Sequence, residues 1–242
     1  GATNAVQLLT DAEAARGVAT HSSGNHGQAL AMAARVRGVP CNVVMPHNSV
    51  QLKLDAVRAQ GATVHLCEPT MAAREAGVTQ VCAATGATEI HPFTDPRVIA
   101  GQGTAVMELL DDRPGIEIIL TPVGGGGLIS GSAVAAHAHD PGIAVVGAEP
   151  DAARDAFDSL ATGQRVTDHV PDTICDGLRG TIGPINFAVM QHHAVEVRLV
   201  TDDEVRGAMT LIRDALGFVV EPSSATAVAA VARYPERFAG RS

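Results

Sequence analysis

The sequence is poor in residue types that several classes of protein require. It has one lysine, one tyrosine and no tryptophan in 242 residues, and aromatic side chains make up 2% of it. The formal net charge of −9 gives no basic surface for nucleic acid, and few rings are present to stack on single strands. No apolar run approaches the roughly 20 residues that span a bilayer. We therefore expect neither a nucleic-acid partner nor a membrane.

The four cysteines show no CxxC spacing, which argues against a metal or redox motif. Cys41 and Cys67 lie in strand-like apolar runs, and we expect them to be buried thiols. The N-terminal residues have no basic region and no hydrophobic segment of the signal-peptide kind. These features predict a cytoplasmic location.

Helical and strand-like patterns alternate along most of the chain, as in βαβ units. Helices are expected at 2–15, 25–36, 50–60, 70–84, 97–110, 128–139, 151–161, 202–216 and 223–233. Strands are expected at 18–20, 41–45, 63–67, 88–91, 116–123, 144–148 and 194–200, with a loop from 163 to about 184. This order predicts an α/β fold whose mostly parallel sheets are covered by helices on both faces.

Two turns between a strand and a helix have unusual composition. In HSSGNHGQAL at 21–30, hydroxyl, amide and imidazole groups crowd the start of a helix, which suits a carboxylate. An ordinary Ser or Asn N-cap would need only one of them. Four consecutive glycines at 124–127 follow the apolar run 116–123, and their backbone N–H groups suit a phosphate. The alternative for them is a close-packed turn without a ligand.

Six segments occur in one order: THSSGNHGQALA, HPFTDPRVIAGQGT, VGGGGLISG, GAEP, DGLRG and EPSSA. Together they closely resemble the serine/threonine dehydratase and serine racemase group of pyridoxal-phosphate enzymes, which have the tryptophan-synthase-β fold (fold type II). The resemblance covers essentially the whole chain. It implies a smaller lobe at 17–94 and a larger lobe formed by 1–16 and 95–242.

The resemblance also implies residues that bind the cofactor. Gly124, Gly125, Gly126 and Gly127 look like the loop that holds the phosphate of pyridoxal 5'-phosphate. Asn25 looks like the residue that hydrogen-bonds the ring hydroxyl, and Glu221 resembles an acidic residue near the ring.

Further residues resemble the family's substrate site. Ser22, Ser23 and His26 are similar to the group around the substrate carboxylate, and Arg74 resembles an arginine that reaches toward it in racemase-like members. Ser23 is also similar to the serine that acts on the second face of the α-carbon in racemases. The segment at 176–177 looks like part of the pocket wall.

A divalent-cation site is implied as well, for Mg²⁺, Ca²⁺ or Mn²⁺. Glu149, Ala153 and Asp155 resemble the site of some serine racemases, and two carboxylates with a carbonyl suit a hard ion. Two solvated acids at the start of a helix explain the same residues equally well. The four histidines His137, His139, His192 and His193 are expected at the surface rather than around a metal.

The sequence departs from the family at both ends. The family's Schiff-base lysine lies in a Lys-x-Arg-Gly-Ala motif, and Gly1-Ala2 matches only its last two residues. Lys53, the sole lysine, resembles a surface helix position. The family's final glycine-rich strand would follow Ser242. We therefore expect a chain truncated at both ends and inactive as it stands.

The implied activity of the parent enzyme is that of an ammonia-lyase (dehydratase), converting L-threonine or L-serine to a 2-oxo acid and ammonia. Hydroxyaspartate is a further candidate substrate, and serine racemase is the alternative activity. Taken literally, a chain without that lysine would be a pseudoenzyme that binds pyridoxal phosphate or an amino acid. A dinucleotide-binding domain is disfavoured, because 123–131 lacks the GxGxxG spacing. The family suggests a homodimer or homotetramer.

Overall fold

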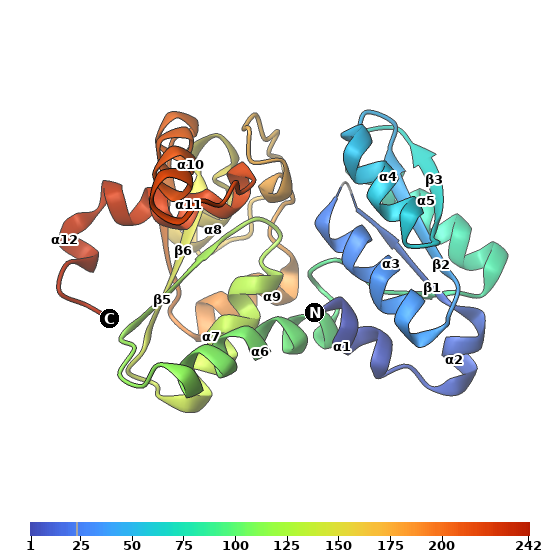
Figure 1. Cartoon of the computed structure of the whole chain (residues 1–242), viewed down its shortest axis with the longest axis horizontal. Coiled ribbons are helices and arrows are strands. Elements are labelled where there is room, and N and C mark those ends of the chain that lie inside the picture. The colour runs from blue at the N-terminus through green and yellow to red at the C-terminus, as the bar shows by residue number, and fades with distance from the viewer. Residues whose placement is uncertain (23) are drawn as a thin grey trace. The chain divides into compact units, whose positions relative to one another are not determined.

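The computed structural model describes residues 1–22 and 24–242. Contacts divide the chain into two compact units, Gly1–Gly101 and Gln102–Ser242 (Figure 1), and the boundary lies within helix α6 (Pro96–Asp112). Among the described residues, no helix is both long and apolar enough to cross a membrane.

In the described part of the first unit, four parallel strands form a sheet in the order β3-β2-β1-β4. The strands are β1 (Val18–His21), β2 (Cys41–Pro46), β3 (Thr63–Cys67) and β4 (Thr88–Glu89). The helices are α1 (Ala2–Gln7), α2 (Asp11–Arg16), α3 (Asn25–Arg37), α4 (Gln51–Ala59) and α5 (Met71–Thr85).

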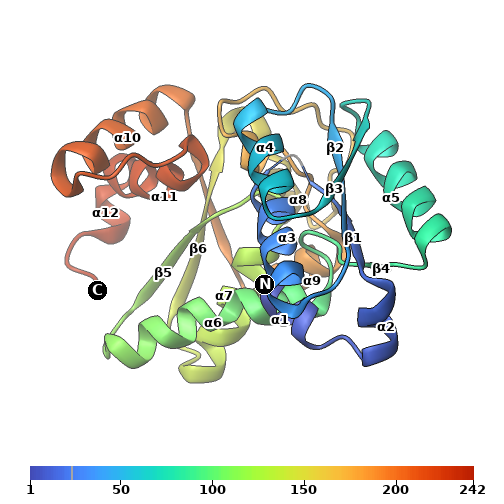
Figure 2. The same ribbon diagram turned by 45° about the vertical axis from the view of Figure 1, so that its right-hand side comes forward.

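Alternating side chains of the central strands supply the cores on the two faces of this sheet. Val43 and Met45 belong to a buried cluster with residues of α1, α3 and α4. Val44, between them, packs with Val78 and Val81 of α5. Figure 2 shows α5 on the opposite side of the sheet from α3 and α4. The period of two in the strand therefore explains why helices cover both faces.

The N-terminal segment differs from the expected single helix at 2–15. It forms α1 and α2, which are separated because Thr10 begins a new helix with a capping box: its hydroxyl accepts the N–H of Glu13, whose carboxylate accepts the N–H of Thr10. Ala2, Val6 and Leu9 of this segment are buried with the core of the first unit. The division into units thus groups residues 1–16 with the first unit, which differs from the predicted lobe boundaries.

The second unit has a three-stranded parallel sheet in the order β5-β6-β7. The strands are β5 (Ile118–Pro122), β6 (Ala144–Pro150) and β7 (Glu196–Val200). The helices are α7 (Gly127–His139), α8 (Asp155–Thr162), α9 (Pro184–His192), α10 (Asp202–Leu216), α11 (Pro222–Arg233) and α12 (Pro235–Phe238), with 3₁₀ turns η1 (Asp151–Ala153) and η2 (Asp176–Leu178).

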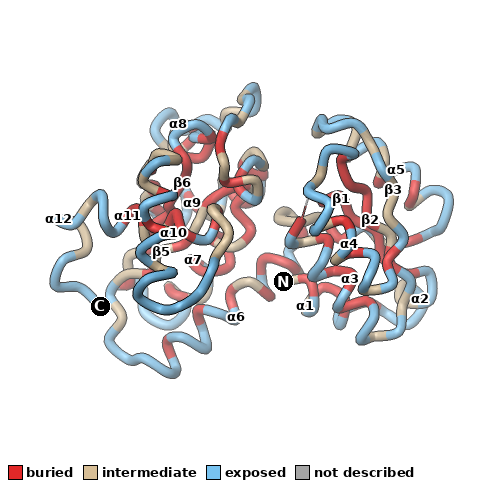
Figure 3. Tube along the Cα trace, turned by 45° about the horizontal axis from the view of Figure 1, so that its top comes forward, coloured by how far each residue is buried: buried red, intermediate tan, exposed pale blue. Residues whose placement is uncertain are grey.

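The buried clusters of this unit again lie on two faces. One contains Ile119 and Val145 together with residues of α7 and α9. The other contains Ala148 and Val200 with residues of α10 and α11. Figure 3 shows buried residues along β6 and exposed ones at α12. The predicted α/β fold with parallel sheets flanked by helices is confirmed.

Two predictions for this unit were wrong. The expected helix at 151–161 is a 3₁₀ turn, η1, followed by α8, because the backbone at Arg154 has φ −94° and ψ 26°, which interrupts a continuous helix. Helix α9 was missed: Pro184 occupies its first turn, a position that a proline tolerates, but the preceding Pro- and Gly-bearing segment was interpreted as loop.

Candidate functional site

The glycine loop follows β5 and leads directly into α7. Gly126 is the N-cap of α7 with φ +90°, and no side chain caps the helix. A Cβ atom at Gly124 would lie 2.9 Å from Cα of Leu178, and one at Gly126 would lie 2.8 Å from Cβ of Asn186. Side chains at Gly124 and Gly126 are therefore excluded, and the N-cap residue Gly126 itself has no side chain to accept the first N–H groups of α7. This arrangement suits a phosphate group.

Two other predicted segments lie beside this loop. Leu178, which contacts Gly124, is the last residue of η2. Within η2, the N–H of Gly177 donates to Oγ of Ser223 at 3.1 Å, and a Cβ at Gly177 would lie 3.8 Å from Oε1 of Glu221. The second unit thus brings together the glycine loop, the predicted pocket wall and the predicted ring-side acid. The end of β5 positions the glycine loop, and Glu221 is the N-cap of α11.

In the first unit, the candidate carboxylate site lies where β1 ends and α3 begins. Ser22 is buried, and its Oγ accepts the N–H of Gly24 at 3.2 Å. Gly24 is the N-cap of α3, and Asn25 is its exposed first residue. Ser23, predicted to act on the α-carbon, lies outside the described residues.

His21, the last residue of β1, was not predicted as a site residue. It is 2% exposed, and its Nε2 has no hydrogen-bond partner among the described residues. Its ring meets that of His91 edge-on, with 5.1 Å between centroids. Burial, helped by repulsion from His91 and Arg74, lowers the pKa of His21 to about 3. His21 is therefore a neutral imidazole at physiological pH.

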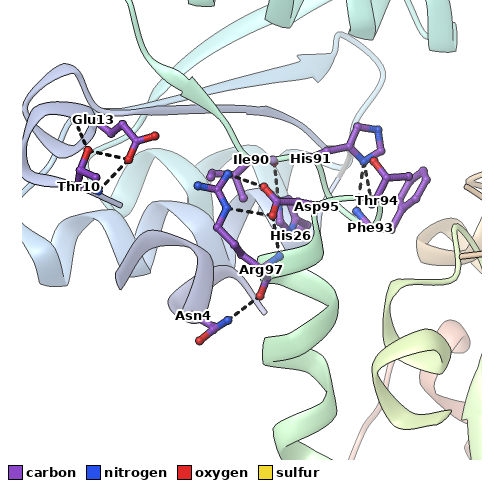
Figure 4. Close-up of polar contacts among 10 residues, drawn as sticks. All are labelled: Asn4, Thr10, Glu13, His26, Ile90, His91, Phe93, Thr94, Asp95 and Arg97. Carbon is purple, nitrogen blue, oxygen red and sulfur yellow. Dashed lines mark hydrogen bonds and ion pairs between the residues drawn. The ribbon is translucent and has the colours of Figure 1, made fainter. Parts of the chain in front are cut away.

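Figure 4 shows how the neighbouring histidines are held. Nε2 of His26 is 3.3 Å from the carbonyl oxygen of Ile90. Because burial lowers the pKa of His26 to about 4 and a carbonyl only accepts, the neutral ring carries its proton on Nε2. Nδ1 of His91 accepts the N–H of Thr94 at 3.2 Å.

Arg74 extends from α5, and its Nε is buried without a partner among the described residues. Burial lowers its pKa from the usual value of 12.5, yet a guanidinium remains charged at neutral pH. Its repulsion of His21 shows that the two side chains are near each other. A cavity of about 520 Å³ lies in the same unit, lined by Glu89, His91, Thr94, Asp95, Pro96 and Arg97.

Lys53 does not occupy the plain surface position that was expected. It extends from α4 and is half-buried. A Cβ atom built on Gly24 would lie 2.8 Å from its Cδ and 3.1 Å from its Nζ. Lys53 therefore lies against the loop that contains Ser22 and Gly24. Its spacing from that loop in the sequence gave no signal of this contact.

The two predicted cation-binding acids are buried instead of solvated. Glu149 is fully buried, and its two oxygens accept the N–H groups of Ala156 at 2.9 Å and Phe157 at 2.8 Å. Burial raises the pKa of Glu149 to about 8. Oδ2 of Asp155 accepts the N–H of Ile182 at 2.7 Å, and burial raises the pKa of Asp155. Ala153, in η1, is also buried.

Of the four histidines expected at the surface, two are exposed and two are half-buried. His139 and His192 are exposed, but Nδ1 of His137 and Nδ1 of His193 are 2.8 Å apart and both rings are half-buried. In the described ranges, 1–22 and 24–242, no group of three or more His, Cys, Asp or Glu side chains is arranged to hold a metal. All four cysteines are free thiols; Cys41 is buried as predicted and Cys67 is partly exposed.

Comparison with known proteins agrees with this geometry. A family model described as pyridoxal-phosphate dependent enzyme matches residues 1–242. This chain belongs to that family. The β-hydroxyaspartate dehydratase of Paracoccus denitrificans is 45% identical over 241 residues, covering 100% of this chain and 76% of that protein. The serine racemase of Dictyostelium discoideum is 45% identical over 233 residues, covering 96% and 72%.

A solved structure of maize serine racemase superposes with a TM-score of 0.95 and 38% identity, covering 99% of this chain and 73% of that one. This member of the pyridoxal-phosphate-dependent enzyme family thus has the fold of the dehydratases and racemases, fold type II, as the sequence predicted. The relatives named above include a dehydratase and serine racemases, so family membership alone does not distinguish between the two activities.

Proposed function

We propose that the complete enzyme is an ammonia-lyase that converts L-serine, L-threonine or a β-hydroxylated relative to a 2-oxo acid and ammonia. The glycine loop carries this proposal, because Gly124 and Gly126 exclude side chains from the uncapped start of α7. The β-hydroxyaspartate dehydratase, to which the whole chain is similar, supports elimination as the reaction class.

The residues present fit the cofactor that the family uses. Gly124–Gly127 would hold its phosphate with backbone N–H groups, and the positive end of α7 would add to the attraction. Asn25 would bind the ring hydroxyl, and Glu221 would lie near the ring. When bound, pyridoxal phosphate takes up the electron pair released at the α-carbon of an amino acid.

For the substrate, Arg74 of α5 and Ser22 at the end of β1 would bind the carboxylate. The guanidinium supplies charge and two directed donors. His26 would not donate a hydrogen bond to the carboxylate. Its proton on Nε2 is donated to the carbonyl of Ile90, which leaves Nδ1 as an acceptor. An acceptor there suits the substrate's ammonium or hydroxyl group.

The test uses protein expressed from the complete gene. We expect L-serine, L-threonine or β-hydroxyaspartate to yield a 2-oxo acid and ammonia. Borohydride reduction with pyridoxal phosphate should place the cofactor on a lysine encoded upstream of Gly1. A cofactor found only on Lys53, or on no residue, would contradict the proposal and favour a non-catalytic binding protein. Light scattering on the same sample tests the predicted homodimer or homotetramer.

Serine racemase is the second candidate function, favoured by the relatives from Dictyostelium and maize. Racemisation needs a proton delivered to the second face of the α-carbon, and Ser23 is the residue proposed for this. Replacing Ser23 with alanine should lower racemisation of L-serine at least about 100-fold while elimination falls much less, because only one face loses its proton donor. Chiral chromatography and a keto-acid assay measure the two rates; equal losses would remove Ser23 from that role.

We further propose a divalent cation bound by Glu149, Asp155 and the carbonyl of Ala153. Burial raises the pKa of both carboxyls, and a positive ion would add countercharge to Glu149 and to Asp155, whose Oδ1 lies 3.9 Å from Nε2 of His169. Mg²⁺, Ca²⁺ or Mn²⁺ at about 100 times its Kd should stabilise the chelator-treated protein by about 2.7 kcal/mol. Protons must leave the carboxyls first, so the affinity should rise from pH 6 to pH 8.

Thermal unfolding with and without the ion measures this effect. Asp155→Asn should abolish it, while Asp158→Asn, which changes a half-exposed acid of the same helix, should leave it intact. If none of the three ions changes the unfolding temperature of the chelator-treated wild type, the site is ruled out.

A further inference from the structure

The C-terminal ends of α7 and α9 meet at a pair of histidines that the proposed function does not use. His137 lies in the last turn of α7, and His193 is the C-cap of α9; the two helices pack together in the second unit (Figure 1). Nδ1 of His137 lies 2.8 Å from Nδ1 of His193, and the two rings are tilted by 53°. Both side chains are half-buried, so water and small ions can reach them.

Hydrogen bonding fixes which nitrogen of each ring is available. Nε2 of His137 is 2.9 Å from the carbonyl oxygen of Ile143, which only accepts, so the neutral ring carries its proton on Nε2. Nδ1 of His137 then has a free lone pair, and it accepts the Nδ1 proton of His193. Histidines that bind metals in proteins usually donate their other ring nitrogen to a carbonyl or carboxylate in this way. His137 is therefore already oriented as a ligand.

The distance between the two nitrogens indicates which geometry a bound ion would have. With metal–nitrogen bonds of about 2.0–2.1 Å, nitrogens 2.8 Å apart make an angle of about 85–90° at the metal. This is the angle between neighbouring ligands in the square-planar and tetragonal sites of Cu²⁺ and Ni²⁺. A tetrahedral Zn²⁺ would need the nitrogens about 3.3 Å apart. The pair therefore suits Cu²⁺ or Ni²⁺ better than Zn²⁺.

The electrostatics of this position favour a cation. The last carbonyl groups of a helix carry partial negative charge, and two such helix ends meet here. Asp140, the C-cap of α7, adds a full negative charge to the same end of that helix. A positive ion between the two rings would therefore be attracted by both helices.

The backbone beside His193 is strained. Ala194 has φ +50°, and it is the one non-glycine residue with a positive φ in the part of the chain that the structure describes. The ends of α3, α5, α8 and α10 use glycine for this conformation. Strain of this kind is typical of ligand clamps, where the surroundings hold the backbone in place. It is an observation independent of the distance between the two rings.

We propose that His137 and His193 chelate a Cu²⁺ or Ni²⁺ ion through their Nδ1 atoms, and that this ion links the end of α7 to the end of α9. The ion replaces the proton between the rings: the Nδ1 proton of His193 leaves to solvent and Nε2 of the same ring takes up another, so both rings stay neutral. Each ring turns about its Cβ–Cγ bond, which has broad energy minima, to direct its lone pair at the ion. Water supplies the remaining ligands, because the described residues form no group of three His, Cys, Asp or Glu side chains around a metal position.

The experiment uses the holoenzyme from the complete gene, made without a polyhistidine tag. Electron paramagnetic resonance of bound Cu²⁺ counts the imidazole ligands from their nitrogen splitting, and calorimetry gives the Kd of Ni²⁺. His137→Gln and His193→Gln each remove one ligand. His139→Gln and His192→Gln are the matched controls, since they change exposed histidines at the ends of the same two helices.

The tightest-bound Cu²⁺ of the wild type should show two nitrogen ligands, and Ni²⁺ should raise the unfolding temperature even in excess Mg²⁺, which prefers oxygen ligands. In His137→Gln and in His193→Gln the Kd of Ni²⁺ should rise at least about 10-fold, because the loss of an outer-shell partner alone costs about 10–100-fold. Both control variants should match the wild type. Binding should weaken below about pH 6.5, where protons compete for the imidazoles.

A wild type that Ni²⁺ does not stabilise, or a Cu²⁺ spectrum without two nitrogen ligands, would overturn the proposal and leave a hydrogen bond between the rings. Loss of binding in His139→Gln or His192→Gln, with His137→Gln unaffected, would place the ion on exposed histidines and also overturn it. If a variant does not fold, the Cu²⁺ spectrum of the wild type still decides. Catalytic activity does not enter the test, so its outcome is separate from that of the proposed function.

Discussion

Replacing Gly126 with alanine should destabilise the protein by about 2–5 kcal/mol and abolish binding of the cofactor's phosphate. Two causes add up. Gly126 has φ +90°, where a Cβ is strained, and that Cβ would collide with Cδ1 of Ile182 and lie 2.8 Å from Cβ of Asn186. Ile182 is fully buried, so it has little room to move aside.

Gly163→Ala is the matched control. Gly163 also has positive φ, +73°, at the end of α8, but a Cβ there would have no atom within 4 Å. Only the backbone strain remains, and we expect a loss of about 1 kcal/mol with normal cofactor binding. Urea unfolding and titration with pyridoxal phosphate measure both effects. Equal losses in the two variants would mean that the contacts around the glycine loop are not close-packed.

Acid should destabilise the protein through His21 and His26. Both have a lowered pKa in the folded state, about 3 and about 4, against 6.5 in the unfolded chain. Below pH 6.5 the unfolded chain therefore binds more protons, and the free energy of unfolding falls as the pH falls. Each histidine contributes a loss of up to about 1.4 kcal/mol per pH unit, until the pH reaches its folded-state pKa. Above pH 6.5 these two groups contribute no pH dependence.

His21→Phe should remove one of these contributions and flatten the curve. Between pH 6.5 and 4.5 the variant should lose up to about 2.7 kcal/mol less than the wild type. A buried phenyl ring also fits the edge-on contact with His91. His139→Gln, a change at an exposed histidine of α7, is the control and should follow the wild type. Urea unfolding at several pH values decides; identical slopes for all three proteins would show that His21 is not buried in the neutral form.

Local patterns in the sequence determined most of the secondary structure. The capping box at Thr201 and Glu204 marks the start of α10, and the prediction at 202–216 matches that helix from end to end. The apolar run before the four glycines gave β5, and the glycines themselves gave the loop into α7. Such signals consist of residues that are close together in the sequence, so they can be interpreted without knowledge of the fold.

Local patterns failed where a break or a start depends on its surroundings. One example is Thr10, which separates α1 from α2, and another is Pro184, which begins α9. Threonine and proline are also common in loops, so neither residue alone signals a helix boundary. The placement of residues 1–16 with the first unit follows from the burial of Val6 and Leu9 in its core, which no periodicity reveals.

For the site, the order of segments in the sequence by itself identified the family and the cofactor that the family uses, and it predicted the kind of reaction. Only the tertiary structure decided what each group can do there. It buried His21 with no partner for Nε2 among the described residues, fixed the proton of His26 on Nε2, buried Glu149, and placed Lys53 against Gly24. The physical reason is that residue identity sets the available chemistry, whereas pKa, tautomer and charge arrangement depend on neighbours brought in from distant parts of the chain.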